Sequence, residues 1–312
     1  MATVITTKPP QAAPLPSGRR RGRPSPGRVL AWVVLALVVL ITIFPFYWML
    51  RTALSNGRAL ATAPDSLLPV QTTVGAFERV LGIESPEEAI AQGGAGTSLQ
   101  FWQYLLNSVI VSVIITVCQV SFSALAAYGF SRLKWRGRDT LFNILLTALM
   151  VPGIFTLLPN FVLIRNLGLL NSYLGIVAPS LFMTPFALFF LRQFFIGLPR
   201  EVEEAALIDG AGRFRIFTRI IVPMSMSPLA TLAFLTYITA WNDYLWPLIV
   251  GSDDRVRTLT VAIGVFQSQT PSGSPDWPGL MAATLIAAVP VLILFAFLGR
   301  RIVDSLGFSG VK

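Results

Sequence analysis

Six apolar stretches alternate with polar segments along the chain. A membrane-spanning helix needs about 20 mainly apolar residues. The stretches that meet this length cover residues 29–50, 105–130, 141–164, 173–194, 229–250 and 280–298. The pattern therefore predicts an all-α integral membrane protein with six transmembrane helices.

Proline residues lie in two of the predicted spans. Pro152, Gly153 and Pro159 lie in the third span, and Pro179 and Pro185 lie in the fourth. Proline lacks a backbone donor and bends or breaks a helix. We therefore expect the third span to be a kinked or interrupted helix, whose freed backbone groups must face protein or a water-filled path.

Basic residues gather on one side of the predicted spans. They lie in residues 19–28, 132–138, 192–219 and 300–301. Such segments face the cytoplasm, which predicts that both termini are cytoplasmic and that residues 51–100 and 251–279 form irregular external loops. The expected domains are a disordered basic tail over residues 1–28, a membrane domain over 29–301 and a cytoplasmic tail over 302–312.

Residues 199–223 form a long polar segment between the fourth and fifth spans. Acidic residues follow Pro199 and suit the positive end of a helix: Glu201, Glu203 and Glu204. Gly210-Ala211-Gly212 can end that helix. Phe214, Phe217 and Ile221 then recur at helical spacing among arginines. The segment predicts two short helices joined at glycine on the membrane surface, with an ordinary connecting loop as the alternative.

Composition narrows the function classes. Of 312 residues, 54% are hydrophobic and 12% are charged, which leaves little soluble mass. The net charge of +9 does not indicate a nucleic-acid partner, because the arginines flank spans and the cluster Arg19–Arg23 suits anionic membrane lipid. A single cysteine, Cys118, and no histidine argue against a metal site. No titratable constellation points to an enzyme.

Polar residues follow one face of the fifth span. Thr236, Thr239 and then Asn242 or Asp243 are spaced three to four residues apart and could line a path for a neutral, hydroxyl-rich solute. Two alternatives stay open. The polar groups could simply join helices, and Asp243 could lie at the outer interface within a belt of aromatic residues, Trp241, Tyr244 and Trp246.

The order of residues in segment 199–223 resembles the EAA loop of ABC importer permeases. Glu204-Ala205-Ala206 is followed at the family's spacing by Gly210, Ile220 and Pro223, while Val222 stands where the pattern has leucine. Asp209-Gly210-Ala211 is similar to the carbohydrate-importer branch. Other short motifs resemble the six-span, maltose-type permease: Asn107-Ser108, Arg136-Gly137-Arg138, Val151-Pro152, Gly168-Leu169-Leu170-Asn171, Leu191-Arg192-Gln193-Phe194-Phe195, Trp241-Asn242-Asp243 and Gly310-Val311-Lys312.

This resemblance implies a type I ABC importer permease, a multi-pass protein of the cytoplasmic membrane. It implies that segment 199–223 is a cytoplasmic coupling loop that docks on a separate ATPase dimer. The coupling residues it implies are Glu204, Ala205, Ala206, Asp209, Gly210, Phe214, Phe217 and Pro223. The further implied partners are a second permease, forming a heterodimer, an extracytoplasmic solute-binding protein and a sugar.

No cofactor is expected in this chain, because ATP would be bound by the ATPase subunit and the chain has no Walker A sequence. The alternative function is a secondary transporter or channel for a small neutral solute. Such proteins usually carry intramembrane ionisable residues, which are scarce in these spans.

Overall fold

The computed structural model describes residues 26–83, 85–92, 100–268 and 276–307. The chain divides into two compact units, residues 1–47 and 48–312. Most of the expected basic tail, residues 1–25 with the cluster Arg19–Arg23, lies outside the described residues. Its last three residues, 26–28, already belong to a helix.

Helix α1 (Pro26–Ala53) contains the predicted first span. All side chains of residues 26–47 are exposed, and the most apolar window of the helix has a mean hydropathy of 2.8. A helix that is apolar on every side suits lipid as its surroundings.

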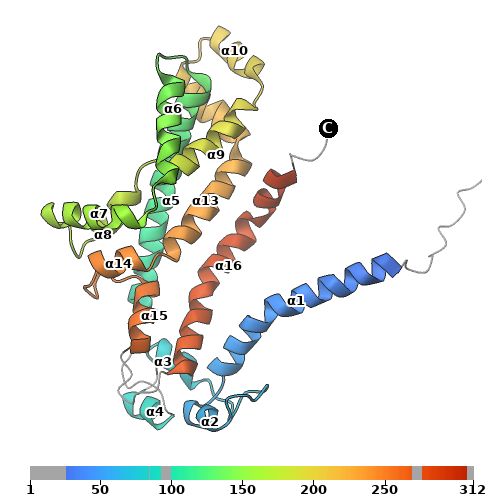
Figure 1. Cartoon of the computed structure of the whole chain (residues 1–312), viewed down its shortest axis with the longest axis vertical. Coiled ribbons are helices and arrows are strands. Elements are labelled where there is room, and N and C mark those ends of the chain that lie inside the picture. The colour runs from blue at the N-terminus through green and yellow to red at the C-terminus, as the bar shows by residue number, and fades with distance from the viewer. Residues whose placement is uncertain (1–25, 84, 93–99, 269–275, 308–312) are drawn as a thin grey trace, which may run out of the picture. The chain divides into compact units, whose positions relative to one another are not determined.

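All the regular elements in the described residues of the second unit are helices, joined by turns and loops (Figure 1). Its elements are α2 (Gly57–Thr62), α3 (Gly75–Val80), α4 (Pro86–Ala91), α5 (Phe101–Arg132), α6 (Arg138–Thr147), η1 (Ala148–Met150), α7 (Ile154–Asn166), α8 (Tyr173–Val177), η2 (Ala178–Ser180), α9 (Pro185–Ile196), α10 (Arg200–Ile208), α11 (Arg213–Ile216), η3 (Phe217–Ile221), α12 (Val222–Met224), α13 (Met226–Trp241), α14 (Leu245–Val250), α15 (Leu259–Ser268) and α16 (Trp277–Gly307). Helix α5 packs against both α9 and α13, and α13 packs against α16.

Three helices of the described chain are long and apolar enough to span a membrane, and three bent helix pairs bring the number of spans to as many as six. The long helices are α1, α5 and α16. The bent pairs break by 100° between η1 and α7, by 50° between η2 and α9, and by 81° between α12 and α13. The first break confirms the expected interruption of the third span, while the break in the fourth span was not predicted. Pro159, however, lies inside α7 without ending it, so the chain breaks only at Val151–Gly153.

The predicted fifth span, residues 229–250, is wrong as a continuous helix. Helix α13 stops at Trp241 and α14 begins at Leu245. The side-chain Nδ2 of Asn242 donates to the carbonyl of Ile238 at 3.0 Å, and the Asp243 carboxylate accepts the backbone N–H of Trp246. Polar side chains at the break therefore bond to the backbone of the helices on either side. The length of the apolar run alone does not indicate this break.

The two predicted external loops are also more ordered than expected. Residues 51–100 contain α2, α3 and α4, and residues 251–279 contain α15. Helix α16 continues to Gly307, into the expected tail, and residues 308–312 with Gly310-Val311-Lys312 lie outside the described residues.

Long-range hydrogen bonds hold these segments, and they explain the Asn107-Ser108 motif. Both residues are buried near the start of α5. Asn107 Nδ2 donates to the carbonyl of Arg257 at 2.8 Å, and Ser108 Oγ accepts the backbone N–H of Leu259 at 2.8 Å. Asn107 Oδ1 also accepts the hydroxyl of Tyr173 at 2.6 Å. The motif therefore ties the start of α15 to α5.

A buried ion pair joins the segment between α1 and α5 to the start of the last span. Arg79 on α3 lies against Asp276, with Nε to Oδ2 at 3.2 Å and Nη2 to Oδ1 at 3.4 Å. Asp276 also accepts the backbone N–H of Gly279 at 2.9 Å at the start of α16. A Cβ at residue 279 would lie 2.6 Å from the Asp276 carboxylate, so glycine permits this close approach.

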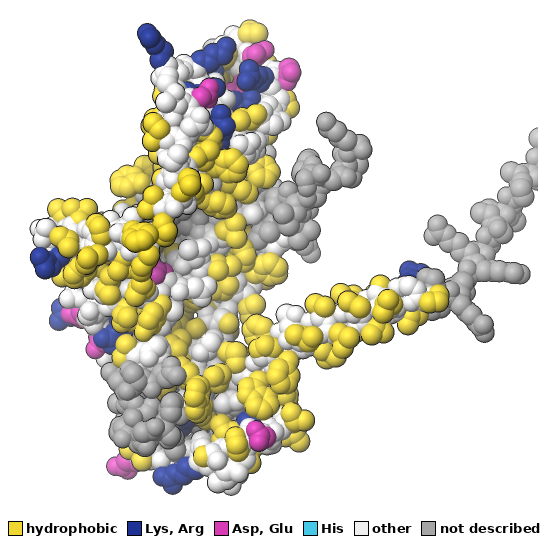
Figure 2. Space-filling model, viewed as in Figure 1, with side chains coloured by type: hydrophobic (Ala, Val, Ile, Leu, Met, Phe, Trp, Pro, Cys, Tyr) yellow, Lys and Arg dark blue, Asp and Glu magenta, His cyan; other side chains and the backbone are white. Residues whose placement is uncertain are grey.

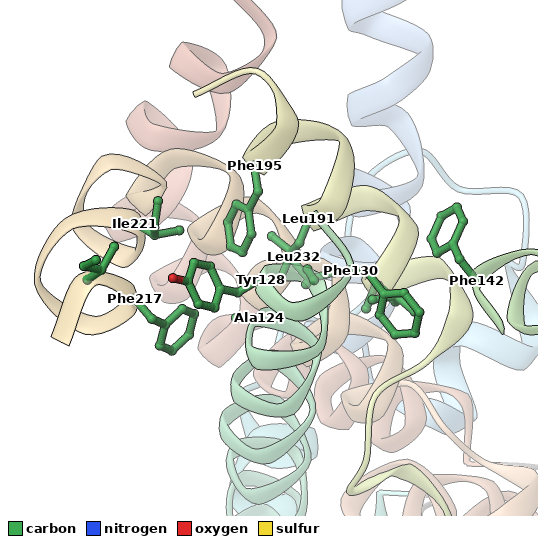
Figure 3. Close-up of a cluster of buried hydrophobic side chains, with 13 residues drawn as sticks. Ala124, Tyr128, Phe130, Phe142, Leu191, Phe195, Phe217, Ile221 and Leu232 are labelled. Atoms are coloured by element: carbon green, nitrogen blue, oxygen red, sulfur yellow. The ribbon is translucent and has the colours of Figure 1, made fainter. Parts of the chain in front are cut away.

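The largest apolar cluster lies between α5, α9, α13 and the segment α11–η3 (Figure 3). Leu188, Leu191 and Phe195 from α9 are fully buried there, beside Leu232 of α13. Burying one side chain of this size stabilises the folded protein by about 1.5–3 kcal/mol. This cluster is the support on which segment 199–223 is built.

Candidate functional site

Segment 199–223 folds as two helices joined at glycine, as its sequence predicts. Helix α10 ends in a Schellman motif, in which Ala211 N donates to Ala206 O at 2.9 Å and Gly210 N donates to Leu207 O at 3.0 Å. Gly210 has φ +80°, a left-handed conformation that glycine adopts without strain. The turn directs the chain from α10 into α11.

The second half of the segment is anchored in the protein core. Ile216, Phe217 and Ile221 are buried in the cluster of Figure 3, and the ring of Phe217 lies 5.3 Å from that of Tyr128. The expectation that Phe217 offers its ring to a partner is therefore wrong, because the ring is already enclosed by this chain. Residues 217–221 form a π-helix just before Pro223, an element common at functional sites.

The first half of the segment and its tip are exposed. Ile208 and Phe214 are 87% and 71% exposed, although both are large and apolar. Of the other predicted coupling residues, Ala206 is half-buried and the rest lie on the surface: Glu204, Ala205, Asp209, Gly210 and Pro223. Figure 2 shows charged side chains gathered around this end of the second unit, near α10. The segment thus has a buried base and an exposed apolar and acidic tip.

One feature of the base was missed by sequence reasoning. Glu203 is 6% exposed, and its Oε1 lies 3.1 Å from Nε of Arg132 at the end of α5. The pair is close enough to interact as ions, although the two atoms are not aligned as a hydrogen bond. Arg132 Nη2 also donates to the carbonyls of Phe195, in a short contact, and of Leu198 at 2.7 Å. Glu203 directly precedes the recognisable motif, and nothing in the sequence distinguishes it from the neighbouring acidic residues.

A second arginine, Arg192, lies at the same end of the bundle as Arg132. Arg192 of α9 stacks over the ring of Phe142, with its guanidinium carbon 4.0 Å from the ring centre, and its Nη2 lies 3.7 Å from Asp139. A hydrogen bond from Arg138, aided by the charges of both arginines, holds the pKa of Asp139 below its ordinary value. The motifs around residues 138 and 192 therefore meet at the same end of the bundle as α10.

A cleft of about 590 Å³ opens between α10 and the turn after α5. Its charged lining residues are Arg132, Lys134, Arg200, Glu203, Glu204 and Arg213. Cations outnumber carboxylates in this lining, so the cleft is positive beside the exposed acidic residues of α10.

A second cavity, of about 670 Å³, lies between α5, α9 and α13. Thr236, Thr239 and Asp243 line it, as the predicted solute path requires, but Asn242 does not. Asn242 is exposed at the end of α13, with its side chain bonded to the helix backbone.

Three further polar residues line this central cavity and were not predicted: Gln119, Ser180 and Thr184. Gln119 Nε2 donates to Thr184 Oγ1 at 3.4 Å. Its long amide side chain in the middle of a predicted span was the available signal. The lining that the structure describes includes no arginine or lysine. Within the described residues, no group of three metal-ligating side chains comes together.

Comparison with known proteins agrees with this architecture. Residues 119–307 match the family model "Binding-protein-dependent transport system inner membrane component". The chain is 35% identical over 281 residues to the inner membrane ABC transporter permease protein YcjP of Escherichia coli, covering 89% of this chain and 94% of that protein. It is 32% identical over 286 residues to the trehalose/maltose transport system permease protein MalG of Thermococcus litoralis, covering 91% and 97%.

A third relative is the sn-glycerol-3-phosphate transport system permease protein UgpE of Salmonella typhi, 32% identical over 278 residues, which cover 89% of this chain and 95% of that protein. Among solved structures, a chain of a bacterial ABC transporter involved in the import of alginate superposes with a TM-score of 0.74 at 22% identity, covering 88% of this chain and 95% of that chain. This likeness supports the fold. The chain therefore belongs to the family of binding-protein-dependent transport system inner membrane components, the non-catalytic permease subunits of ABC importers.

Proposed function

We propose that this permease carries a sugar or a related hydroxyl-rich solute, and that segment 199–223, called the coupling loop from here on, transmits the action of a separate ATPase dimer. The observation that carries the proposal is the two-sided coupling loop. Its base is fixed by Phe217 and Ile221, while Ile208 and Phe214 project from its tip. A monomer gains nothing from exposing such side chains at a polar end, whereas a docked partner would bury them.

The tip has the size and chemistry of a small docking peg. Burying Phe214 in a partner's cleft would stabilise the contact by about 1.5–3 kcal/mol. Glu204 and Asp209 are exposed beside it and suit basic side chains on the partner. Because Phe217 and Ile221 hold the base, force on the tip would be passed to the helix bundle instead of bending the coupling loop.

The central cavity supports the solute class. Its lining offers hydroxyl and amide groups from Thr184, Thr236, Thr239 and Gln119, together with the flat ring of Phe186. Such groups suit a solute rich in hydroxyls. One relative is named for the transport of trehalose and maltose, which are neutral solutes of that kind. A second permease subunit would complete the path around the exposed faces of the domain over residues 29–301.

The orientation follows from charge. The coupling loop and both termini would face the cytoplasm, where the basic segments place them. The opposite end, with α3 and the start of α16, would then receive an extracytoplasmic binding protein.

The test is reconstitution of the full complex in lipid vesicles, with both permeases, the ATPase and the binding protein. Uptake of labelled neutral disaccharides and of sn-glycerol-3-phosphate would be measured with and without ATP on the ATPase side. We expect uptake of one of these solutes to require ATP and the binding protein. Uptake that ignores ATP and follows an imposed ion gradient would instead identify a secondary transporter.

A further inference from the structure

We infer that Arg132 is a positioning residue that joins the coupling loop to the two helices bordering the central cavity. Through it, movement of α10 is transmitted to α5 and α9 instead of being absorbed at the turn between α9 and α10. This inference rests on the proposed function and adds the route by which the coupling loop acts.

Arg132 contacts three elements at once. It is the last residue of α5, its Nε lies 3.1 Å from Glu203 of α10, and its Nη2 donates to the backbone after and within the last turn of α9. The two ionic side chains are only 3% and 8% exposed. A planar guanidinium with several donors is suited to bridging a carboxylate and carbonyl groups simultaneously.

The contact between α5 and α9 is reciprocal. Arg192 of α9 donates through Nε to the carbonyl of Phe130 on α5 at 3.2 Å, while Arg132 of α5 donates to the carbonyls of Phe195 and Leu198. Each helix therefore carries an arginine that bonds to the C-terminal backbone of the other. Such a pair resists sliding of one helix along its neighbour.

Both helices run from this end to the central cavity. Helix α9 starts at Pro185, directly after the cavity residue Thr184, and its 12 residues are about 18 Å long. Helix α5 carries Gln119 on the cavity and Arg132 at its end. A displacement of α10 would thus reach the Gln119–Thr184 contact through two rigid helices, a continuous physical connection between the sites.

Burying the Arg132–Glu203 ion pair has a large desolvation cost. Taking both charges out of water offsets much of their attraction, so an apolar contact would serve stability as well. What the pair adds is a fixed geometry between Glu203 and the ends of α5 and α9. The adjacent Glu204, by contrast, stays exposed for a partner.

The experiment uses the reconstituted complex with Glu203→Gln and Arg132→Gln. Three quantities are measured: ATPase association, ATP hydrolysis, and solute moved per ATP hydrolysed. We expect association and hydrolysis to persist, because the exposed tip is untouched, while solute moved per ATP falls at least about fivefold. Arg132→Lys, which keeps a positive charge and hydrogen-bond donors at this position, should lose less than Arg132→Gln.

Arg165→Gln is the control, because Arg165 is an exposed arginine near the end of α7, and its loss should leave all three quantities unchanged. Unaltered solute per ATP in Glu203→Gln and Arg132→Gln would overturn the inference. Loss of ATPase association in both would also overturn it, since Glu203 would then only shape the docking surface. Absence of ATP-driven uptake by the unmodified complex would count against the proposed function itself.

Discussion

Gly210 is the residue whose backbone conformation decides the direction of the coupling loop. Its φ of +80° lies in the left-handed region, and a Cβ placed there would meet no atom within 4 Å. Substitution therefore costs conformational energy without a clash. A left-handed backbone costs an ordinary side chain about 1–2 kcal/mol, and asparagine tolerates it better than β-branched residues do.

We expect Gly210→Val to reduce ATP-driven uptake severalfold while the protein remains in the membrane, and Gly210→Asn to retain most uptake. Uptake by vesicles, normalised to the amount of inserted protein, checks both variants. Equal activity of Gly210→Val and the unmodified protein would show that the left-handed turn is dispensable.

Ser108 and Ser112 lie one turn apart on α5, and both are buried. Ser108 Oγ accepts the backbone N–H of Leu259, whereas Ser112 Oγ has no hydrogen-bond partner among the described residues. Ser108→Ala should leave a buried donor unsatisfied and lower stability by about 1–3 kcal/mol, while Ser112→Ala should be neutral or slightly stabilising. Thermal unfolding of the detergent-purified protein, followed by tryptophan fluorescence, should separate the two. The reverse order of melting temperatures would contradict this assignment.

At the scale of elements, the length of each apolar stretch predicted which segments span the membrane but not where their helices break. Pro152 and Gly153 announce the break before α7, because proline cannot continue the backbone pattern. The break at Asn242–Tyr244 contains no proline. Its polar residues, Asn242 and Asp243, interrupt the apolar run only briefly, because Trp241 and Leu245 continue the run on both sides. Helix α15 likewise depends on its bond to Ser108, which only the folded chain provides.

The candidate site shows the same limit. The glycine turn at Gly210 follows from local sequence. The burial of Phe217 does not, because helical spacing places Phe214 and Phe217 together without saying which one faces α5. The Arg132–Glu203 pair joins residues far apart in sequence and depends entirely on the packing of α5 against α9.

The two phenylalanines of the coupling loop should therefore behave differently. Phe217→Ala removes a buried ring and should destabilise the protein by about 3–5 kcal/mol. Phe214→Ala should leave the melting temperature within error and weaken binding of the ATPase. Unfolding curves and co-purification of the ATPase measure the two effects. A loss of thermal stability in Phe214→Ala would mean that its exposed ring is not a docking element.

At the scale of the whole molecule, the basic segments assign the two ends to opposite sides of the membrane. The single native cysteine can be removed by Cys118→Ser, which provides a background for labelling. In intact cells, Ser85→Cys should react with an impermeant thiol reagent, and Thr140→Cys should react only after permeabilisation. Both positions are exposed in the fold. Labelling of residue 140 in sealed cells would reverse the assigned orientation.

The ion pair between Arg79 and Asp276 also imposes an order in time. The two residues are 197 positions apart. At a synthesis rate of about 5–20 residues per second, Asp276 is therefore synthesised roughly 10–40 s after Arg79. Ser108 and Leu259, 151 positions apart, face a similar delay. The end of the protein with α3 and the start of α16 therefore closes only as the last helix emerges from the ribosome. Until then the segment with α3 is not joined to the last span, so this end of the permease is the last part of the fold to be completed.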